Sequence, residues 1–177
     1  REHGALTLGS GARFDGRGAR VAVDRGTGEV GLALAAMGRA GSMHDVDSTI
    51  APSTAGPEVR YARAPGVIEW WRSLPSGLEQ GVTIDAPPAG DGALALEMAI
   101  SDHTRAELAS PDEIILRDAA THRALARYAH LVVLDASGLR VPGRMSIDGA
   151  RIALAIDAAG ARYPLVVAPL VAAEAAT

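Results

Sequence analysis

Apolar side chains recur at every second position along most of this chain of 177 residues. The run Ala93–Ile100 is the clearest case, because two leucines, a methionine and an isoleucine stand at alternate positions in it. A spacing of two places successive side chains on opposite faces of a strand, whereas a helix needs a spacing of three to four. The pattern therefore predicts strands and argues against a helical fold.

Shorter runs of the same kind, separated by turn signals, extend this prediction to most of the chain. Arg25–Gly28 is one such turn, and Asp148-Gly149 is a strong signal for a two-residue hairpin. We expect about ten to twelve short strands in an all-β fold, an antiparallel β-sandwich of two sheets. The further runs are Ala19–Asp24, Val30–Ala36, Ile114–Arg117, Ala129–Asp135, Arg144–Ile147, Arg151–Asp157 and Tyr163–Val167.

One segment allows a helical alternative. His122–Leu131 is rich in alanine, leucine and arginine, which have good helix propensity. Leu125, Tyr128 and Leu131 would share one face of such a helix. The neighbouring segments pair well as strands, so we expect a strand here, although alanine is a poor strand former.

The length of the chain fits one domain with a sizeable core. We assign residues 1–170 to this domain and residues 171–177 to a linker or tail without a pattern of its own. Residues 38–57 contain many small and turn-forming residues and little periodicity, so we expect a mobile loop there. The chain begins with Arg1 and not with methionine, which suggests a mature or excised fragment.

Composition excludes several classes of protein. The net charge is −4, which argues against a partner nucleic acid, and no apolar run approaches the ~18 residues of a membrane span. The absence of cysteine excludes disulfides and thiolate chemistry. All basic residues are arginine, which we attribute to the codon bias of a GC-rich bacterium. No cofactor is expected.

The segment Glu58–Ile84 concentrates the large aromatic residues of the chain. It holds both tryptophans and one of three tyrosines, and the whole chain has one phenylalanine. Because each large aromatic side chain can bury about 150–250 Å², we expect this segment at the centre of the core.

Trp70 and Trp71 are the candidate ligand-binding residues. Consecutive strand residues point to opposite faces, so one ring is expected in the core and the other at the surface. An exposed ring could stack on a sugar or anchor a partner. The alternative is that one ring belongs to the core and the other packs beneath residues 38–57.

No set of residues in the sequence forms a catalytic motif, so we expect that the protein is not an enzyme. Glu69, Glu79 and Asp85 lie on adjacent runs, and two converging carboxylates could hydrolyse glycosidic bonds. The simpler interpretation of Glu79 is that it caps backbone N–H groups or pairs with an arginine.

Metal ligation is also weakly indicated. The segment His44–Asp47 offers nitrogen and oxygen ligands, but it lacks the glycine and the later glutamate of a calcium loop. His44, His103, His122 and His130 lack the short spacings of zinc motifs. We therefore expect scattered surface histidines and no metal site.

Several segments together resemble a known family. They are the Val59–Tyr61 strand, the GVIEWW run 66–71, the GLEQGVTI run 77–84, the LVVLDASG run 131–138 and the ARYPLVVAPL run 161–170. In this order they are similar to the amino-terminal β-rich module of large secreted myxobacterial-type proteins, which precedes FG-GAP (integrin-α-like propeller) repeats. The resemblance covers Ala12 to Leu170. The family more often has Trp-Tyr at 70–71 and Asp-Pro-Leu at 168–170.

The resemblance implies a non-catalytic structural, assembly or adhesion module of an exported bacterial surface protein, secreted or on the cell surface. No FG-GAP repeat or calcium loop occurs in this chain, and the family has no catalytic residues to transfer. The expected partners are other domains of the same or a neighbouring surface protein. The alternative function is a carbohydrate-binding module that uses Trp70 or Trp71 to hold a polysaccharide. A further possibility is self-association through edge strands.

Overall fold

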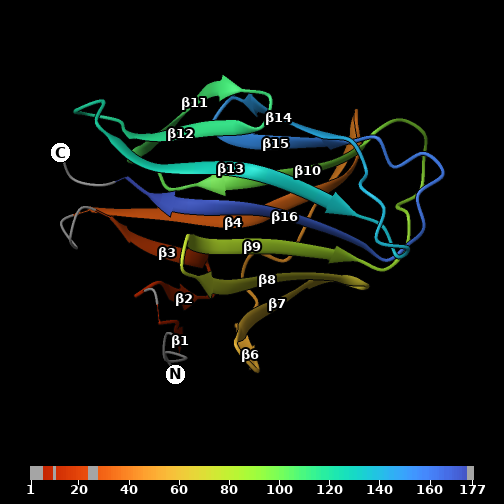
Figure 1. The fold of residues 1–177 in the computed structure, drawn as a ribbon, viewed down its shortest axis with the longest axis horizontal. Coiled ribbons are helices and arrows are strands. Elements are labelled where there is room, and N and C mark those ends of the chain that lie inside the picture. The colour runs from red at the N-terminus through yellow and green to blue at the C-terminus, as the bar shows by residue number, and fades with distance from the viewer. Residues whose placement is uncertain (1–5, 10, 24–27, 175–177) are drawn as a thin grey trace.

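The chain folds into a sandwich of two antiparallel sheets of eight strands each, in a computed structural model that describes residues 6–9, 11–23 and 28–174 (Figure 1). The first sheet has the order β1 (Leu6–Thr7), β2 (Arg13–Asp15), β3 (Gly18–Val23), β4 (Gly28–Arg39), β10 (Leu94–Ile100), β15 (Arg151–Ile156), β14 (Gly143–Asp148), and β5 (Ser42–Asp45) also pairs with β4. The second sheet has the order β11 (Thr104–Ser110), β12 (Glu113–Asp118), β13 (Ala124–Leu134), β16 (Leu165–Ala173), β9 (Gly77–Ile84), β8 (Val67–Leu74), β7 (Glu58–Ala64), β6 (Ser53–Ala55).

The predicted all-β sandwich is confirmed, but the described residues form sixteen strands and not ten to twelve. The additional strands are mostly short: β1, β2, β5 and β6 each have two to four residues. Such strands contain too few residues to show alternation, and β11 reads TRAELAS, with charged residues where a buried strand would be apolar. Periodicity therefore underestimates the strand count.

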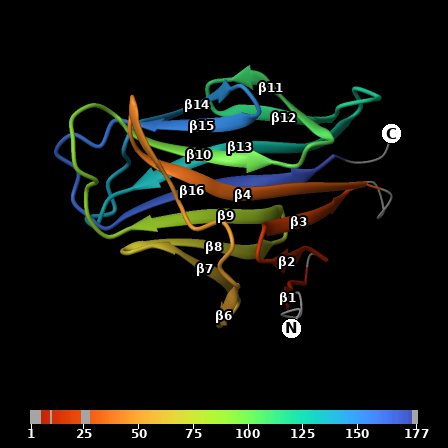
Figure 2. The same cartoon turned by 180° about the vertical axis from the view of Figure 1, so that it is seen from behind.

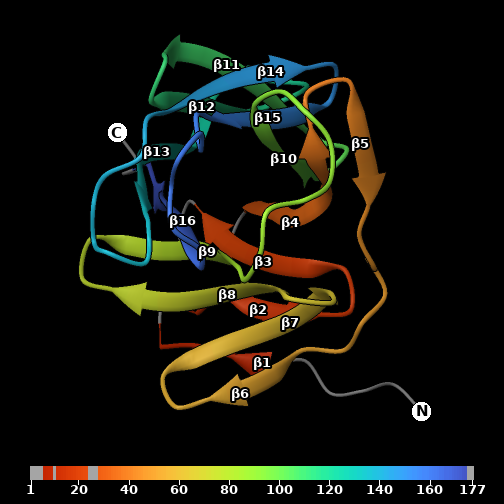
Figure 3. The same ribbon diagram turned by 90° about the vertical axis from the view of Figure 1, so that its right-hand side faces the viewer.

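The two sheets face each other across one core (Figures 2 and 3). Strands β7, β8 and β9 form an antiparallel meander from the aromatic-rich segment Glu58–Ile84, with a two-residue turn between Leu74 and Gly77. Tyr61 and Trp71 of this meander are fully buried, as predicted for the centre of the core. Phe14 of the opposite sheet lies 6.0 Å from Trp71 between ring centroids.

Most of the predicted turns and strands lie where the pattern placed them. The segment 122–131 contains most of β13, so the strand interpretation is confirmed over the helical one. Asp148 pairs with Arg151, which makes Asp148-Gly149 part of a tight hairpin, as predicted. Of the turn Arg25–Gly28, residues 25–27 lie outside the described residues and Gly28 begins β4, and the strands that flank the turn pair with each other.

Two segments contain more strand than the sequence indicated. Residues 38–57 include the end of β4 and all of β5 and β6, and the backbone N–H of Asp47 donates to the carbonyl of Arg63. Strand β16 continues to Ala173, so the boundary at residue 170 was placed too early. The reason is that Val171 is buried and pairs with both Leu78 and Tyr128.

One edge of each sheet lies against the other sheet's edge at one side of the sandwich. β11 and β14 contact each other, and the backbone N–H of Met145 donates to the carbonyl of Pro111 at 2.6 Å. The β11 edge carries Arg105 and Glu107, and charges of this kind discourage edge-to-edge pairing. In the described part of the chain there is no helix of the length and hydropathy that a membrane span requires.

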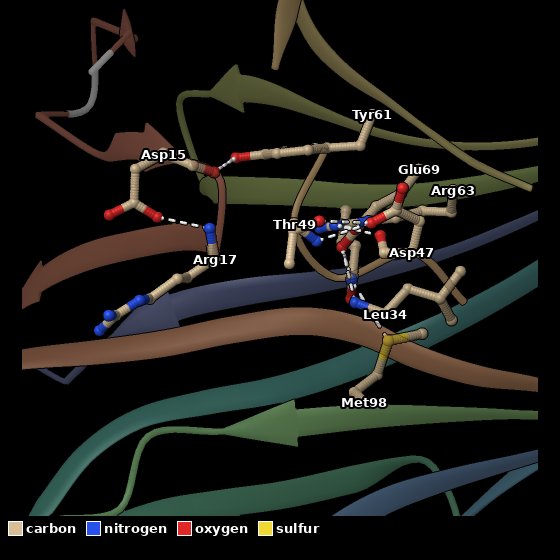
Figure 4. A network of polar contacts seen from close by, with 10 residues as sticks. Asp15, Arg17, Leu34, Asp47, Thr49, Tyr61, Arg63, Glu69 and Met98 are labelled. Atoms are coloured by element: carbon tan, nitrogen blue, oxygen red, sulfur yellow. Dashed lines mark hydrogen bonds and ion pairs between the residues drawn. The ribbon is translucent and has the colours of Figure 1, made fainter. Parts of the chain in front are cut away.

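A buried carboxylate connects the two sheets in the interior (Figure 4). Glu69 on β8 accepts a hydrogen bond from Arg63 Nε at 2.7 Å, and neither side chain has any exposed surface. The second oxygen of Glu69 accepts from Gln80 Nε2 at 2.8 Å and from the backbone N–H of Leu34, in the opposite sheet, at 3.1 Å. The Tyr128 hydroxyl donates to Gln80 Oε1 at 2.7 Å. The carboxylate is tolerated in the core because it is paired with Arg63 and accepts three hydrogen bonds, whereas Nη2 of Arg63 is buried without a hydrogen-bond partner.

The buried ion pair gives a prediction for stability. Replacing Arg63 by methionine leaves the Glu69 carboxylate without its counter-charge, and such a loss costs about 3–5 kcal/mol. Urea unfolding should show this loss in the free energy of unfolding. The double variant Arg63→Met/Glu69→Leu should recover much of it, because no isolated charge remains. A single variant that loses less than about 1 kcal/mol would contradict this role.

The buried tyrosines give a prediction for alkaline pH. Burial, and next the nearby Glu69 charge, raise the pKa of Tyr61 and of Tyr128. A raised pKa stabilises the fold fully below the ordinary value of about 10, and this stabilisation is lost as pH rises through the folded-state pKa. Absorbance of phenolate at 295 nm from these residues should therefore rise only together with unfolding followed by circular dichroism. Ionisation of both in a still folded protein near pH 10 would contradict the prediction.

Candidate binding site

The two adjacent tryptophans lie on opposite faces of β8. Trp71 points into the core and is completely buried, which removes it as a ligand contact. Trp70 is partly buried and, by the alternation along β8, points to the outer face of the second sheet. This sheet is the nearer one in Figure 1. It lies beside strands β9, β16 and β13 and not beneath residues 38–57. Of the two predicted candidates, only Trp70 can meet a ligand.

The indole of Trp70 lies flat on the neighbouring strand because that strand has a glycine beneath it. Trp70 pairs with Gly81, and a Cβ atom added at Gly81 would stand 2.0 Å from Cε2 and Cζ2 of the indole and 2.5 Å from Cδ2. Cε2 and Cδ2 are the two ring-fusion atoms and Cζ2 is the next carbon of the six-membered ring, so a face of the ring, and not its edge, covers Gly81. The indole N–H donates to Thr83 Oγ1 at 3.1 Å, which fixes the orientation of the ring.

Charged groups beside the indole are paired with each other. Arg72 donates from Nε and Nη2 to Glu79 Oε2, at 3.1 and 2.5 Å. Its guanidinium carbon lies 5.4 Å from the centroid of the Trp70 ring, within the range of a cation–π contact. Glu58 pairs with Arg60 at 2.7 Å. The surroundings of the ring are therefore polar but close to electrically balanced.

These residues line a groove of about 450 Å³ on the outer face of the second sheet. Its volume lies in the range of about 300–1,000 Å³ that is usual for ligand sites. Apolar residues make up most of its lining, and polar or charged residues make up the rest. The lining consists of Glu58, Trp70, Arg72, Leu74, Ser76, Glu79, His130, Val132, Leu134, Val166, Ala168, Pro169 and Leu170.

A second, larger hollow of about 740 Å³ lies at the loop end of the sandwich, near Arg39, Arg144 and Tyr163. The guanidinium of Arg39 already donates to the carbonyls of Pro88 and Gly92, at 3.2 Å each. Small residues and loop backbone form most of the remaining wall. Asp91, Arg144 and Asp157 add charged side chains to its lining, so this hollow is more polar than the groove.

The three carboxylates considered as a catalytic set do not converge. Glu69 lies in the core, bound to Arg63, whereas Glu79 lies on the outer face, bound to Arg72. The sheet separates these two carboxylates. Asp85 follows β9 at its end, where its backbone N–H donates to the carbonyl of Gly66. The expected pairing of Glu79 with an arginine is confirmed.

The histidines and the acidic loop are also dispersed. His103 Nε2 lies 2.6 Å from the carbonyl of Glu29, and His44 is exposed on β5. Asp47 Oδ1 accepts from the backbone N–H and the hydroxyl of Thr49, at 2.9 Å each, and these hydrogen bonds lower the pKa of Asp47. Within the described ranges, no three potential ligand residues come together in a group that could hold a metal ion.

Sequence reasoning missed most of the groove. Arg72 could have been found, since it stands two residues from Trp70 on the same strand and so shares its face. Gly81 and Ala168 come beneath and beside the indole only through the register of β8, β9 and β16. His130 enters the groove through an irregularity in β13 that no sequence pattern marks.

Comparison with known proteins assigns no family or function to this site. No protein-family model matches the sequence, and no curated protein matches it. The groove is therefore interpreted from its own geometry.

The contact between Trp70 and Gly81 gives a prediction for the groove. In Gly81→Ala the new methyl group would overlap the indole, so the ring must leave the floor. We expect the tryptophan emission to shift toward longer wavelength, because the displaced ring meets more water. Gly9→Ala is the matched control, since nothing lies within 4 Å of a Cβ at Gly9. An unchanged emission spectrum in Gly81→Ala would contradict the stacked arrangement.

Proposed function

We propose that the protein is a non-catalytic binding module that holds a neutral polysaccharide in the outer groove of its second sheet. One observation carries the proposal: the partly exposed indole of Trp70 lies flat on Gly81 in a groove, with the guanidinium carbon of Arg72 5.4 Å from the ring centroid. A pyranose ring presents a patch of C–H groups on one face, and this patch packs well on a flat aromatic surface.

The polar groups around the indole suit the hydroxyls of a sugar. Arg72 and Glu79 offer planar donors and acceptors side by side, and Ser76 and His130 add others along the groove. A groove with two carboxylates and one guanidinium does not favour an anionic ligand. A neutral ligand rich in hydroxyl groups matches both the apolar floor and the balanced charges.

The position of the groove argues against recognition of an extended peptide. It lies on the face of a sheet, above strands that pair with each other on both sides. Their backbone groups are already hydrogen-bonded, so a peptide cannot add to them as a further strand. Recognition must come from side chains, as it does for sugar rings.

The wider context is part of the proposal. The resemblance to the β-rich modules that precede FG-GAP repeats supports a role in an exported bacterial surface protein. In that setting a groove for polysaccharide would serve adhesion, and other domains of the same or a neighbouring protein would be its structural partners. Self-association through edge strands is a separate possibility, which light scattering of the purified protein measures directly.

Affinity electrophoresis tests the proposed function. The protein should be retarded in gels that contain one or more neutral polysaccharides, such as hydroxyethylcellulose, xyloglucan, galactomannan or laminarin, and less so in gels with alginate. Trp70→Ala removes the stacking surface and should weaken the best interaction at least about tenfold, or about 1.4 kcal/mol. Leu108→Ala is the control, because Leu108 is an exposed apolar residue on β11, outside the groove.

Three results would contradict the proposal. One is the absence of retardation by every neutral polysaccharide. Another is equal binding by Trp70→Ala and the wild type. The third is release of reducing sugars that Glu79→Ala abolishes without unfolding, because this would make the protein a hydrolase.

A further inference from the structure

His130 occupies an unusual backbone conformation on the wall of the groove. Its φ angle is 56°, in the left-handed region that residues with a Cβ atom rarely adopt. Among the residues that the structure describes, positive φ angles occur at twelve glycines and at two histidines, His122 and His130. The chain thus uses glycine at nearly all such positions, and these two are the exceptions.

The conformation of His130 belongs to a bulge in β13. Ala129 pairs with Leu170 and Val132 pairs with Ala168, so β13 has one residue more than β16 between these pairs. Bulge residues in the left-handed region are usually glycine, and bulges often redirect a side chain next to a functional site. Here the bulge presents the imidazole of His130 to the groove that contains Trp70.

No contact of the His130 side chain within the described part of the protein explains why a histidine stands at this position. His130 is exposed, and no other described residue forms a hydrogen bond or an ion pair with its ring. Glycine would satisfy the backbone of the bulge without strain. His122 shows that strain alone does not mark a binding residue, since it lies in the turn before β13, outside the groove. The combination of strain, free imidazole and groove position is specific to His130.

We infer that His130 is a specificity-determining residue of the groove, whose imidazole hydrogen-bonds to a hydroxyl group of the bound polysaccharide. This inference rests on the proposed function. Neutral imidazole has one donor and one acceptor nitrogen, so it can read the position of a hydroxyl group next to the sugar that stacks on Trp70. The bulge in β13 places the imidazole of His130 at the groove, a position that a regular strand would not give it.

The test compares His130→Gly with His122→Gly, on the neutral polysaccharide that retards the wild type most in affinity electrophoresis. Both variants relieve a strained position, so both should keep or raise the melting temperature. Only His130→Gly should weaken binding, by about three- to tenfold, as expected for one hydrogen bond. His130→Asn should retain part of the affinity, because asparagine tolerates positive φ and keeps a donor and an acceptor.

The outcomes separate the inference from the proposed function. If Trp70→Ala loses binding while His130→Gly binds like the wild type, the function stands and the inference is wrong. If His130→Gly and His130→Asn lose binding equally and both melt at lower temperature, the bulge matters and the imidazole does not, which also overturns the inference. If the wild type binds none of the polysaccharides, both fail.

Discussion

The arrangement of the two sheets depends on the hydrogen bonds and the ion pair that the buried carboxylate of Glu69 forms. The partners of this carboxylate are Arg63 and Gln80 in its own sheet and the backbone of Leu34 in the other. A charge inside a sandwich is unfavourable unless it is paired and hydrogen-bonded, so the hydrogen bond from Leu34 favours the placement of the sheets that preserves it. Apolar contacts hold the sheets together with less directional preference. The polar network adds the geometric selectivity that those contacts lack.

Strand β8 links this interior to the outer surface. Its inward residues, Glu69 and Trp71, belong to the buried network and the aromatic core. Its outward residues, Trp70 and Arg72, belong to the groove. Because strand residues alternate strictly, the placement of one set fixes the other. The packing of the core thereby determines which side chains of β8 reach the surface that we propose for polysaccharide binding.

The fold was predictable because alternation is a local property. The sandwich, the Asp148-Gly149 hairpin and the opposite orientation of Trp70 and Trp71 all follow from residues close in sequence. The groove could not be predicted in this way, because it depends on which residues of β8, β9 and β16 lie side by side. The register of Gly81 and its neighbours is set by long-range pairing, which alternation leaves open. The ion pair of Arg63 and Glu69 was equally hidden, since charged residues in a strand normally indicate a solvent-facing position.

The stacking of Trp70 on Gly81 constrains how this surface can evolve. A larger residue at position 81 would expel the indole, and a small residue at position 70 would leave the glycine uncovered. A substitution at either position disturbs the residue at the other, so we expect the two positions to evolve together. Homologous modules should either keep both Trp70 and Gly81 or replace both residues together. Replacement of both would change the surface of the groove and the ligand that it prefers.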